Sequence, residues 1–223
     1  TEPGPYRLSG FSSDSLELFD ITNPLDPVRV SNLVINSRAV TFASDARHRW
    51  LAITPAAIKT PARIAPMSAN NLRAPERKAD YILITHPDFL DALQPLVKHR
   101  QARGLSVTVV TTQEVYDEFG FGLETPFAIR DYLNWARANG SPRFVLLVGK
   151  ASYDYLNYLN APNKNLLPTF LVATPHLGQA ASDNWFVTDE KTGKPTLAIG
   201  RIPAKTPEQV SRVVSKIIAY ETA

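Results

Sequence analysis

The sequence Tyr81-Ile82-Leu83-Ile84-Thr85 decides how the larger part of this chain folds. It is a short and nearly continuous run of apolar residues. Runs of this kind form strands that are buried on both faces, as in parallel sheets whose two faces are covered by helices. The run therefore predicts a central strand, and the sequence around it is expected to alternate between strands and helices.

Such an alternation follows this run to the end of the chain. The expected strands are residues 106–111, 143–148, 166–172 and 196–200, and the expected helices before the last strand are residues 88–103 and 125–140. Thr125 and Pro126 are typical of a helix start, and Gly104 and Gly140 are typical of helix ends. Pro95 lies inside the first of these helices and predicts a later start or a kink.

The last helix carries the strongest signals. Thr206 and Gln209 form a capping box with Pro207 inside it. One apolar stripe follows, formed by Val210, Val213, Val214, Ile217 and Ile218. Strands that alternate with helices favour an α/β fold with a doubly wound, mostly parallel sheet, which is the fold class that we predict.

The first 59 residues have a different character. Short strands are expected at residues 16–21, 28–30, 33–35, 40–43 and 50–53, with turns between them. We interpret residues 1–59 as a β-rich region and the tail of an upstream module, so that the chain is a piece of a longer protein. Residues 60–78 contain Pro61, Pro66 and Pro75 and are predicted to be a linker. Residues 79–223 are then the α/β subdomain.

The amino-acid composition excludes several classes of function. The 223 residues include 24 Lys and Arg, 21 Asp and Glu and no cysteine, with a net charge of +3. The chain therefore has no disulfide, no thiolate metal site and no cysteine nucleophile. The densest basic group, Arg73, Arg77 and Lys78, is interrupted by Glu76 and Asp80, which favours a solvated linker over a nucleic-acid surface. No apolar run approaches the roughly 18 residues of a membrane span, and the first residues do not resemble a signal peptide.

The ligand crevice of a doubly wound sheet lies beyond the carboxyl ends of its strands. The segments expected there are residues 85–88, 111–113, 149–152 and 174–185. Gly149-Lys150 is not a phosphate loop, because Phe144 stands where the upstream glycine is required, and a glycine that eases a bend is favoured. His86 and His176 lie on these segments and could meet in space. The four histidines have no metal-ligand spacing, which favours surface or structural roles.

Two further motifs have a structural interpretation beside a chemical one. Residues 189–195 resemble a calcium loop, but Lys191 stands where an oxygen ligand is needed, so a hairpin turn is favoured. Ser182 and Asp183 with His176 suggest a hydrolytic triad. The serine lacks the Gly-x-Ser-x-Gly elbow, so a serine hydrolase is disfavoured.

Aromatic residues near the predicted crevice also allow two interpretations. Trp185, Phe186, Tyr153 and Tyr155 either line a groove for a peptide or pack as core and rim, which is the commoner role. Arg201, at the end of the final strand, is expected to pair with a carboxylate such as Asp183. Because arginine keeps its charge when buried, such a pair is costly to break from one side.

The order and spacing of several segments resemble the amino-terminal subdomain of the gingipain-like cysteine peptidases. These segments are Ala79 to Thr85, Phe144 to Gly149, Ala151 to Tyr155, Ser182 to Trp185, Ile199 to Pro203, and Tyr220-Glu221. The upstream sequence from Leu18 to Pro24, with Pro27, also resembles the β-rich stretch that precedes such domains.

The resemblance implies a peptidase domain of two side-by-side α/β subdomains, with the catalytic histidine and cysteine both in the second. No residue of this chain matches either of them, so the resemblance assigns no catalytic residue here. It implies that this chain forms one wall of the substrate cleft and braces a catalytic subdomain absent from it. That subdomain is the expected partner, and a peptide or protein is the expected substrate of the whole protein. Alone, the chain is expected to be inactive.

The resemblance also suggests site residues, a cofactor and a location for the protein. The cleft or interface candidates are Asp183, Asn184, Trp185, Arg201 and His176. Calcium is the cofactor to consider, although no residue spacing marks a site for it. The family usually has an acidic residue where Lys150 follows the strand glycine, so no charge-dependent role of that loop is carried over. The expected location is outside a bacterial cell or on its surface.

Two alternatives stay open at this point. The first is a non-catalytic interaction protein or a secretion-sorting protein on the same scaffold. The second is a flavodoxin-like module that binds a small phosphate-bearing ligand in a polar pocket at the strand ends. The peptidase and sorting interpretations predict an exposed apolar face on the last helix or at a sheet edge, whereas the ligand-binding module predicts a self-sufficient fold.

Overall fold

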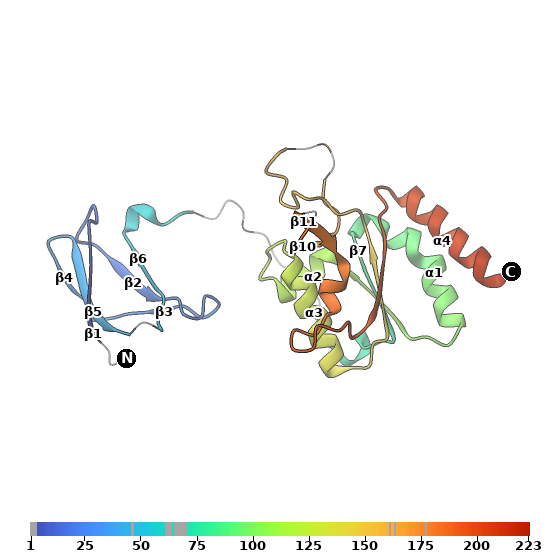
Figure 1. Cartoon of the computed structure of the whole chain (residues 1–223), viewed down its shortest axis with the longest axis horizontal. Coiled ribbons are helices and arrows are strands. Elements are labelled where there is room, and N and C mark those ends of the chain that lie inside the picture. The colour runs from blue at the N-terminus through green and yellow to red at the C-terminus, as the bar shows by residue number, and fades with distance from the viewer. Residues whose placement is uncertain are drawn as a thin grey trace. The chain divides into compact units, whose positions relative to one another are not determined.

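The computed structural model describes residues 4–45, 47–60, 64, 71–160, 162, 164–176 and 178–223. The chain divides into two compact units, Thr1–Pro66 and Met67–Ala223. Figure 1 shows the strands of the first unit and the strands and helices of the second.

The first unit is built from short antiparallel strands. They are β1 (Gly4–Ser9), β2 (Glu17–Asp20), β3 (Val28–Arg29), β4 (Val34–Asn36), β5 (Ala39–Ser44) and β6 (Trp50–Ile53). Two three-stranded sheets result, with the strand orders β1-β5-β4 and β3-β2-β6. Leu18 of β2 and Val40 of β5 are fully buried. The predicted β-rich region is confirmed, and β1 is a strand that the sequence analysis did not predict.

The second unit contains a four-stranded sheet in the order β12-β9-β7-β8. Its strands are β7 (Tyr81–Thr85), β8 (Val107–Thr111), β9 (Phe144–Val148) and β12 (Ala198–Ile202). Neighbouring strands all pair in parallel. The chain moves outward from β7 to β8 on one side and then to β9 and β12 on the other, which is doubly wound topology. The predicted α/β fold class is confirmed.

The side chains of β7 and β9 divide between two cores. Ile82 and Ile84 are buried in one core, whereas Leu83 between them is buried in the other. In the same way, Leu147 belongs to the first core and Leu146 to the second. Because successive residues of a strand point to opposite faces, both faces of the central strands need apolar side chains. This requirement explains why Tyr81 to Thr85 is an unbroken run, not an alternating one.

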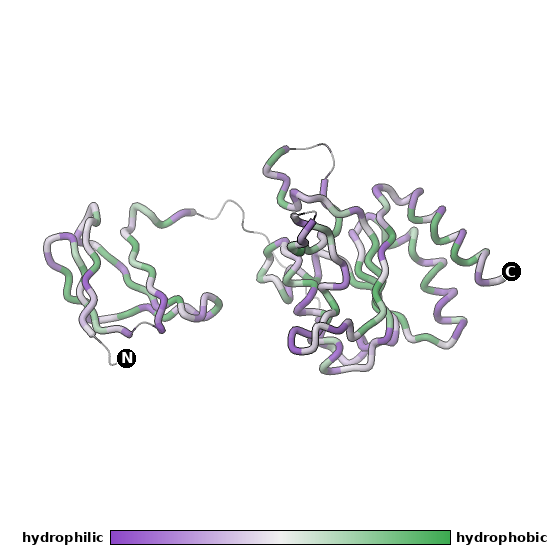
Figure 2. The backbone as a smooth tube through the Cα atoms, viewed as in Figure 1, coloured by the Kyte–Doolittle hydropathy of each residue, from purple (hydrophilic) through white to green (hydrophobic). Residues whose placement is uncertain are grey.

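Helices cover both faces of the sheet. On one face lie α1 (Leu90–Ala102), which follows the short turn η3 (Pro87–Phe89), and α4 (Pro207–Thr222). On the other face lie α2 (Thr112–Phe119), α3 (Pro126–Asn139) and the short helix η4 (Asp183–Val187). Figure 1 shows the two helix layers on either side of β7, and Figure 2 shows hydrophobic strands between them. No helix in the described ranges is long and apolar enough to cross a membrane.

The predicted helix ends are largely correct. Thr206 caps α4 by accepting a hydrogen bond from the backbone N–H of Gln209. The apolar stripe of α4 packs on the sheet, with Val210 and Val214 buried. Pro95 lies within α1, which begins later than predicted, at Leu90.

Three elements differ from the prediction. The helix α2 was missed, although its capping box of Thr111 and Glu114 was present in the sequence. The segment expected to be a crevice loop contains a strand, β11 (Gly178–Ser182), which pairs with β10 (Phe170–Thr174). Residues 189–195 form the predicted turn, closed by a bridge between Thr188 and Pro195, but η4 and not a strand precedes it.

The predicted linker, residues 60–78, lies partly outside the described residues. Its described carboxyl part packs against the second unit. Leu72 is fully buried, and its backbone N–H donates to Glu118 at 2.7 Å. Arg73 lies over the ring of Phe119 at 4.3 Å, and Arg77 pairs with Glu114 at 3.0 Å. These basic side chains are therefore held against the carboxylates and rings of α2.

An ion cluster joins the two helices on the α1–α4 face. The Glu221 carboxylate in the last turn of α4 accepts hydrogen bonds from Arg100, Arg103 and His99 of the α1 region, with the His99 Nε2 atom at 2.9 Å. The Arg100 guanidinium beside it, followed by His99, lowers the pKa of Glu221 from its ordinary value of 4.5 to about 2. The cluster thus anchors the end of α4 to α1.

We predict that Glu221→Gln lowers the free energy of unfolding at neutral pH by about 1.5–3 kcal/mol, the usual range for hydrogen bonds to charged groups. Because the folded pKa is lowered, the contribution of Glu221 is fully present above pH 4.5 and is lost as the pH falls towards about 2. Urea unfolding from pH 7 down to pH 3 measures this. The difference between the variant and the wild type shrinks in acid, whereas Glu76→Gln, at an exposed position, has little effect at any pH. A difference that is constant with pH would contradict the assignment.

Candidate functional site

The candidate site lies at the carboxyl edge of the sheet. Thr85 pairs with Val148, and Val148 pairs with Ile202, so β7, β9 and β12 end side by side. Gly149 continues this edge, because its backbone N–H donates to the carbonyl of Ile202 at 2.9 Å. Segments that leave these strand ends therefore share one edge, where ligands bind in doubly wound folds.

A long connection leaves the sheet at this edge. It comprises residues 150–182, between Gly149 after β9 and Asp183 at the start of η4, and we call it the 150–182 connection. It includes the antiparallel hairpin of β10 and β11, which forms a separate two-stranded sheet. Figure 1 shows β10 and β11 on the side of the sheet where α2 and α3 lie.

Arg201 of β12 stands where the connection begins and ends. Its Nη1 atom donates to the carbonyls of Gly149 and Leu167, both at 2.8 Å. Its Nη2 atom donates to the carbonyl of Pro168 at 2.8 Å. The Nε and Nη2 atoms also donate to the two carboxylate oxygens of Asp183, at 2.7 and 2.8 Å. A guanidinium has five N–H donors, and all of them are used here.

Asp183 balances the charge of this arginine. It accepts a further hydrogen bond from the Thr169 hydroxyl at 2.9 Å. The Arg201 side chain is 11% exposed and that of Asp183 26% exposed, so the pair is shielded from water. The ion pair predicted from the sequence is therefore present, and it is bidentate.

Gly149 is fixed in place by its surroundings. Its φ angle is +145°, and a Cβ atom there would lie 3.1 Å from the Cβ of Leu167 and 3.3 Å from that of Leu166. A larger residue would displace the leucines next to the carbonyls that Arg201 binds. Gly149 is thus the bend predicted from the sequence, and it also allows the start of the connection to pack closely against Leu166 and Leu167 just before the hairpin.

A buried tyrosine lies close to this group. Burial raises the pKa of the Tyr116 phenol, and the neighbouring Glu124 carboxylate adds to the effect. Its hydroxyl therefore stays neutral at physiological pH. Tyr116 therefore supplies no negative charge to Arg201, whose ion-pair partner is Asp183.

The aromatic candidates take different positions. Trp185 is partly buried and stacks on Phe170 of β10, with ring centroids 3.7 Å apart and an interplanar angle of 7°. Phe127 meets both rings edge-on, and the Arg130 guanidinium lies 4.3 Å from the Trp185 ring centroid. Phe186 is fully buried in the core. These rings attach the base of the hairpin to α3, which agrees with the packing interpretation.

The remaining candidates contribute less to this group. Asn184 is exposed, and its carbonyl accepts a hydrogen bond from the Thr188 hydroxyl at 2.7 Å. His176 is exposed in the turn between β10 and β11. Thr174, the last residue of β10, is roughly 13 Å along the strand from Phe170, and His176 lies beyond it. His176 is therefore far from the base of the hairpin. The Asp183 carboxylate is bound by Arg201 and Thr169, so the structure does not support the triad of Ser182, Asp183 and His176.

The outer part of the connection exposes apolar and aromatic side chains and carries few charges, with Lys150 and Asp154 near its start. Tyr153, Tyr158 and Leu159 are 71%, 83% and 76% exposed. Lys164 is the only Lys, Arg, Asp or Glu residue in the sequence from 155 to 182. Tyr153 contacts the hairpin through a hydrogen bond to Gln179 at 3.3 Å. Surfaces depleted in charge and rich in tyrosine are typical of protein interfaces.

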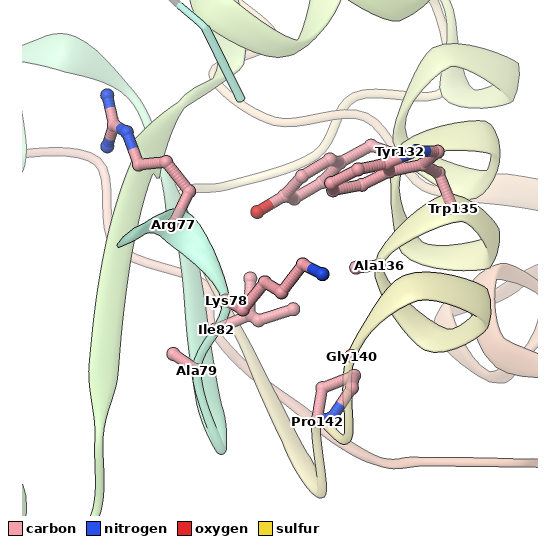
Figure 3. Close-up of a pocket in the computed structure, with 9 residues that line it drawn as sticks. All are labelled: Arg77, Lys78, Ala79, Ile82, Tyr132, Trp135, Ala136, Gly140 and Pro142. Carbon is pink, nitrogen blue, oxygen red and sulfur yellow. The ribbon is translucent and has the colours of Figure 1, made fainter. Parts of the chain in front are cut away.

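A small hollow lies at the opposite, amino edge of the sheet. It is lined by Arg77, Lys78, Ala79, Ile82, Tyr132, Trp135, Ala136, Gly140 and Pro142 (Figure 3). Its volume of about 10 Å³ is close to the minimum for a single water molecule. Within the described residues, no three His, Cys, Asp or Glu side chains gather closely enough to hold a metal ion.

The fold and the sequence together define the class of protein. The family model of peptidase family C25 matches residues 74–223, and the chain belongs to this family. The gingipain-like resemblance drawn from the sequence is thereby confirmed.

Among solved structures, the chain is similar to dimeric latent PorU from Porphyromonas gingivalis, with a TM-score of 0.75 and 20% sequence identity. The match covers 97% of this chain and 23% of PorU, so the chain spans less than a quarter of that protein. At this identity the likeness is one of fold. A second structure, described as "Structure of Protease", gives a TM-score of 0.47 and 18% identity over 63% of this chain and 28% of the other. The search of curated proteins found no match.

We predict that Phe170→Ala lowers the free energy of unfolding of the second unit by about 2 kcal/mol, because a partly buried ring that stacks on Trp185 is lost. The near-ultraviolet circular dichroism of the tryptophans is expected to weaken in the same variant. Tyr153→Ala is the matched control, since Tyr153 is 71% exposed, and its effect on stability is expected to be below about 0.5 kcal/mol. Equal losses in the two variants would contradict the packing described above.

Proposed function

We propose that this chain is the scaffold subdomain of a gingipain-like cysteine endopeptidase. One observation carries the proposal: the C25 family match spans the whole α/β sheet, and the matched residues contain no cysteine. A cysteine peptidase needs a thiolate nucleophile and a base to activate it. Both would therefore come from a second subdomain, and this chain would brace it.

We further propose that the 150–182 connection forms one wall of the substrate cleft. It lies at the carboxyl edge of the sheet, where ligands bind in this class of fold. Its exposed Tyr153, Tyr158 and Leu159 offer apolar and hydrogen-bonding contacts without charge. Asp183, Asn184, Trp185 and Arg201 lie at its base, and His176 lies at the turn of its hairpin. These residues would support and line the wall and not perform chemistry.

A second candidate is an interaction or secretion-sorting protein on the same scaffold. It is compatible with the absence of cysteine from the matched residues. The likeness to latent PorU, which takes in almost the whole chain including the β-rich unit, supports the shared fold. By the same likeness we propose that residues 1–59 are the tail of an upstream module, with the subdomain at residues 79–223. A location outside the cell or on its surface would suit both candidates.

The proposal is tested by extending the sequence beyond Ala223 for roughly 150 residues, about one domain length. If the scaffold role is correct, this part encodes a histidine and a cysteine, each at the end of a strand. The full-length protein then cleaves a peptide substrate and loses this activity after alkylation with iodoacetamide. The matched control is alanine in place of that cysteine, which should leave the fold intact and abolish cleavage.

The 223-residue chain serves as the second control. It is expected to take up no iodoacetamide at cysteine and to cleave nothing. A full-length protein that lacks either catalytic residue, or whose cleavage survives alkylation, would refute the cysteine peptidase. The interaction or sorting candidate would then be preferred.

A further inference from the structure

Arg201 joins points that are far apart in the sequence. Its acceptors are the carbonyl before the 150–182 connection, at Gly149, two carbonyls just before the hairpin, at Leu167 and Pro168, and the Asp183 carboxylate just after it. A single rigid guanidinium therefore fixes where the connection leaves the sheet, where the hairpin begins and where it ends.

The hairpin depends on such an anchor. Strands β10 and β11 pair with each other and form a sheet separate from the four central strands. An isolated two-stranded hairpin is at best marginally stable in water. Besides the hydrogen bonds to Arg201, the base of this hairpin is attached by the stacking of Phe170 on Trp185 and by the edge contact of Phe127 with Phe170. The segment before the hairpin is also held by backbone hydrogen bonds from Leu166 and Leu167 to the Lys150 carbonyl, at 3.0 and 3.4 Å. Loss of the arginine would remove five hydrogen bonds from these attachments.

A second arginine provides an internal comparison. Arg100 on α1 is buried to a similar degree, with 15% of its side chain exposed, and it pairs with Glu221. It joins α1 to α4 and lies 5.6 Å from the ring centroid of Tyr81 at the start of β7, and its buried Nε atom lacks a hydrogen-bond partner within the described residues. A substitution at Arg100 thus shows how a largely buried arginine affects local stability when its side chain does not bind a connecting segment.

We propose that Arg201 is a positioning residue, which holds the 150–182 connection against the carboxyl edge of the sheet. The inference rests on the proposed function only in naming this connection as the cleft wall. Replacement of Arg201 releases the connection as a unit while the four-stranded sheet remains folded. Asp183 acts with Arg201, since it supplies the only carboxylate in the arrangement described above.

Lysine cannot replace the arginine at this position. It has three donors on one nitrogen, whereas Arg201 uses donors on three nitrogens to reach acceptors in different directions. Arg201→Lys therefore keeps the charge but breaks most of the contacts. The lysine variant therefore distinguishes a role in positioning the connection from a role in balancing the charge of Asp183.

Hydrogen exchange of the whole chain, followed by mass spectrometry, tests the inference. In Arg201→Lys, the amides of β10 and β11 are expected to exchange roughly tenfold faster or more, while those of β7 and β9 change by less than about threefold. Asp183→Asn is expected to give the same pattern with a smaller change, and it provides the readout if Arg201→Lys does not fold. In the control Arg100→Lys, any increase is confined to α1, α4 and the start of β7, where Arg100 lies over the ring of Tyr81, and β10 and β11 are unchanged.

Two outcomes would overturn the inference. Unchanged exchange in β10 and β11 would mean that Arg201 does not hold the connection. Equal acceleration in β7, β9 and the hairpin would make Arg201 an ordinary stabilising residue of the whole unit. Neither result depends on cleavage of a peptide, so a failure here is distinguishable from a failure of the proposed peptidase function.

Discussion

Burial of the central strands on both faces is the constraint on which the α/β unit depends. Leu83 and Leu146 face one core while Ile82 and Leu147 face the other, so each helix layer has an apolar surface to cover. The backbone polar groups of these strands are satisfied within the sheet itself. The 150–182 connection leaves the sheet after β9, and the two strands of its hairpin pair with each other and form a separate sheet. Arg201 and Asp183 attach this connection to the ends of the central strands through side-chain hydrogen bonds.

The α/β unit uses partly buried charge for two different purposes. On one face Glu221 joins the helices α1 and α4 through three basic side chains. At the carboxyl edge Arg201 joins connecting backbone through carbonyl oxygens and one carboxylate. A guanidinium is well suited to the second task because its planar donors point in several fixed directions. The first task needs only a cluster of opposite charges, and so it tolerates a buried Nε without a partner in the described part of the chain.

Much of the fold was predictable from local patterns, because the strands and capped helices obey short-range rules. The parallel strands were recognisable from their apolar runs, and α4 from Thr206 and its apolar stripe. The pairing of Arg201 with Asp183 was also anticipated from sequence. Its links to Leu167 and Pro168 were not, since backbone carbonyls leave no trace in residue identity. Strand β11 was missed because the small residues Gly178, Ala180 and Ala181 carry little strand propensity, and pairing with β10 decides their conformation.

The conformation of Gly149 has an evolutionary consequence. A side chain there would push against Leu166 and Leu167, and so would move a carbonyl that Arg201 binds. Arg201 in turn loses its charge partner when Asp183 changes. The three positions are thus coupled, and a neutral replacement at one of them requires adjustment at the others. Among related sequences, this glycine, aspartate and arginine should be inherited together or lost together. A lineage in which they have been lost must attach the same connection to its sheet by different chemistry.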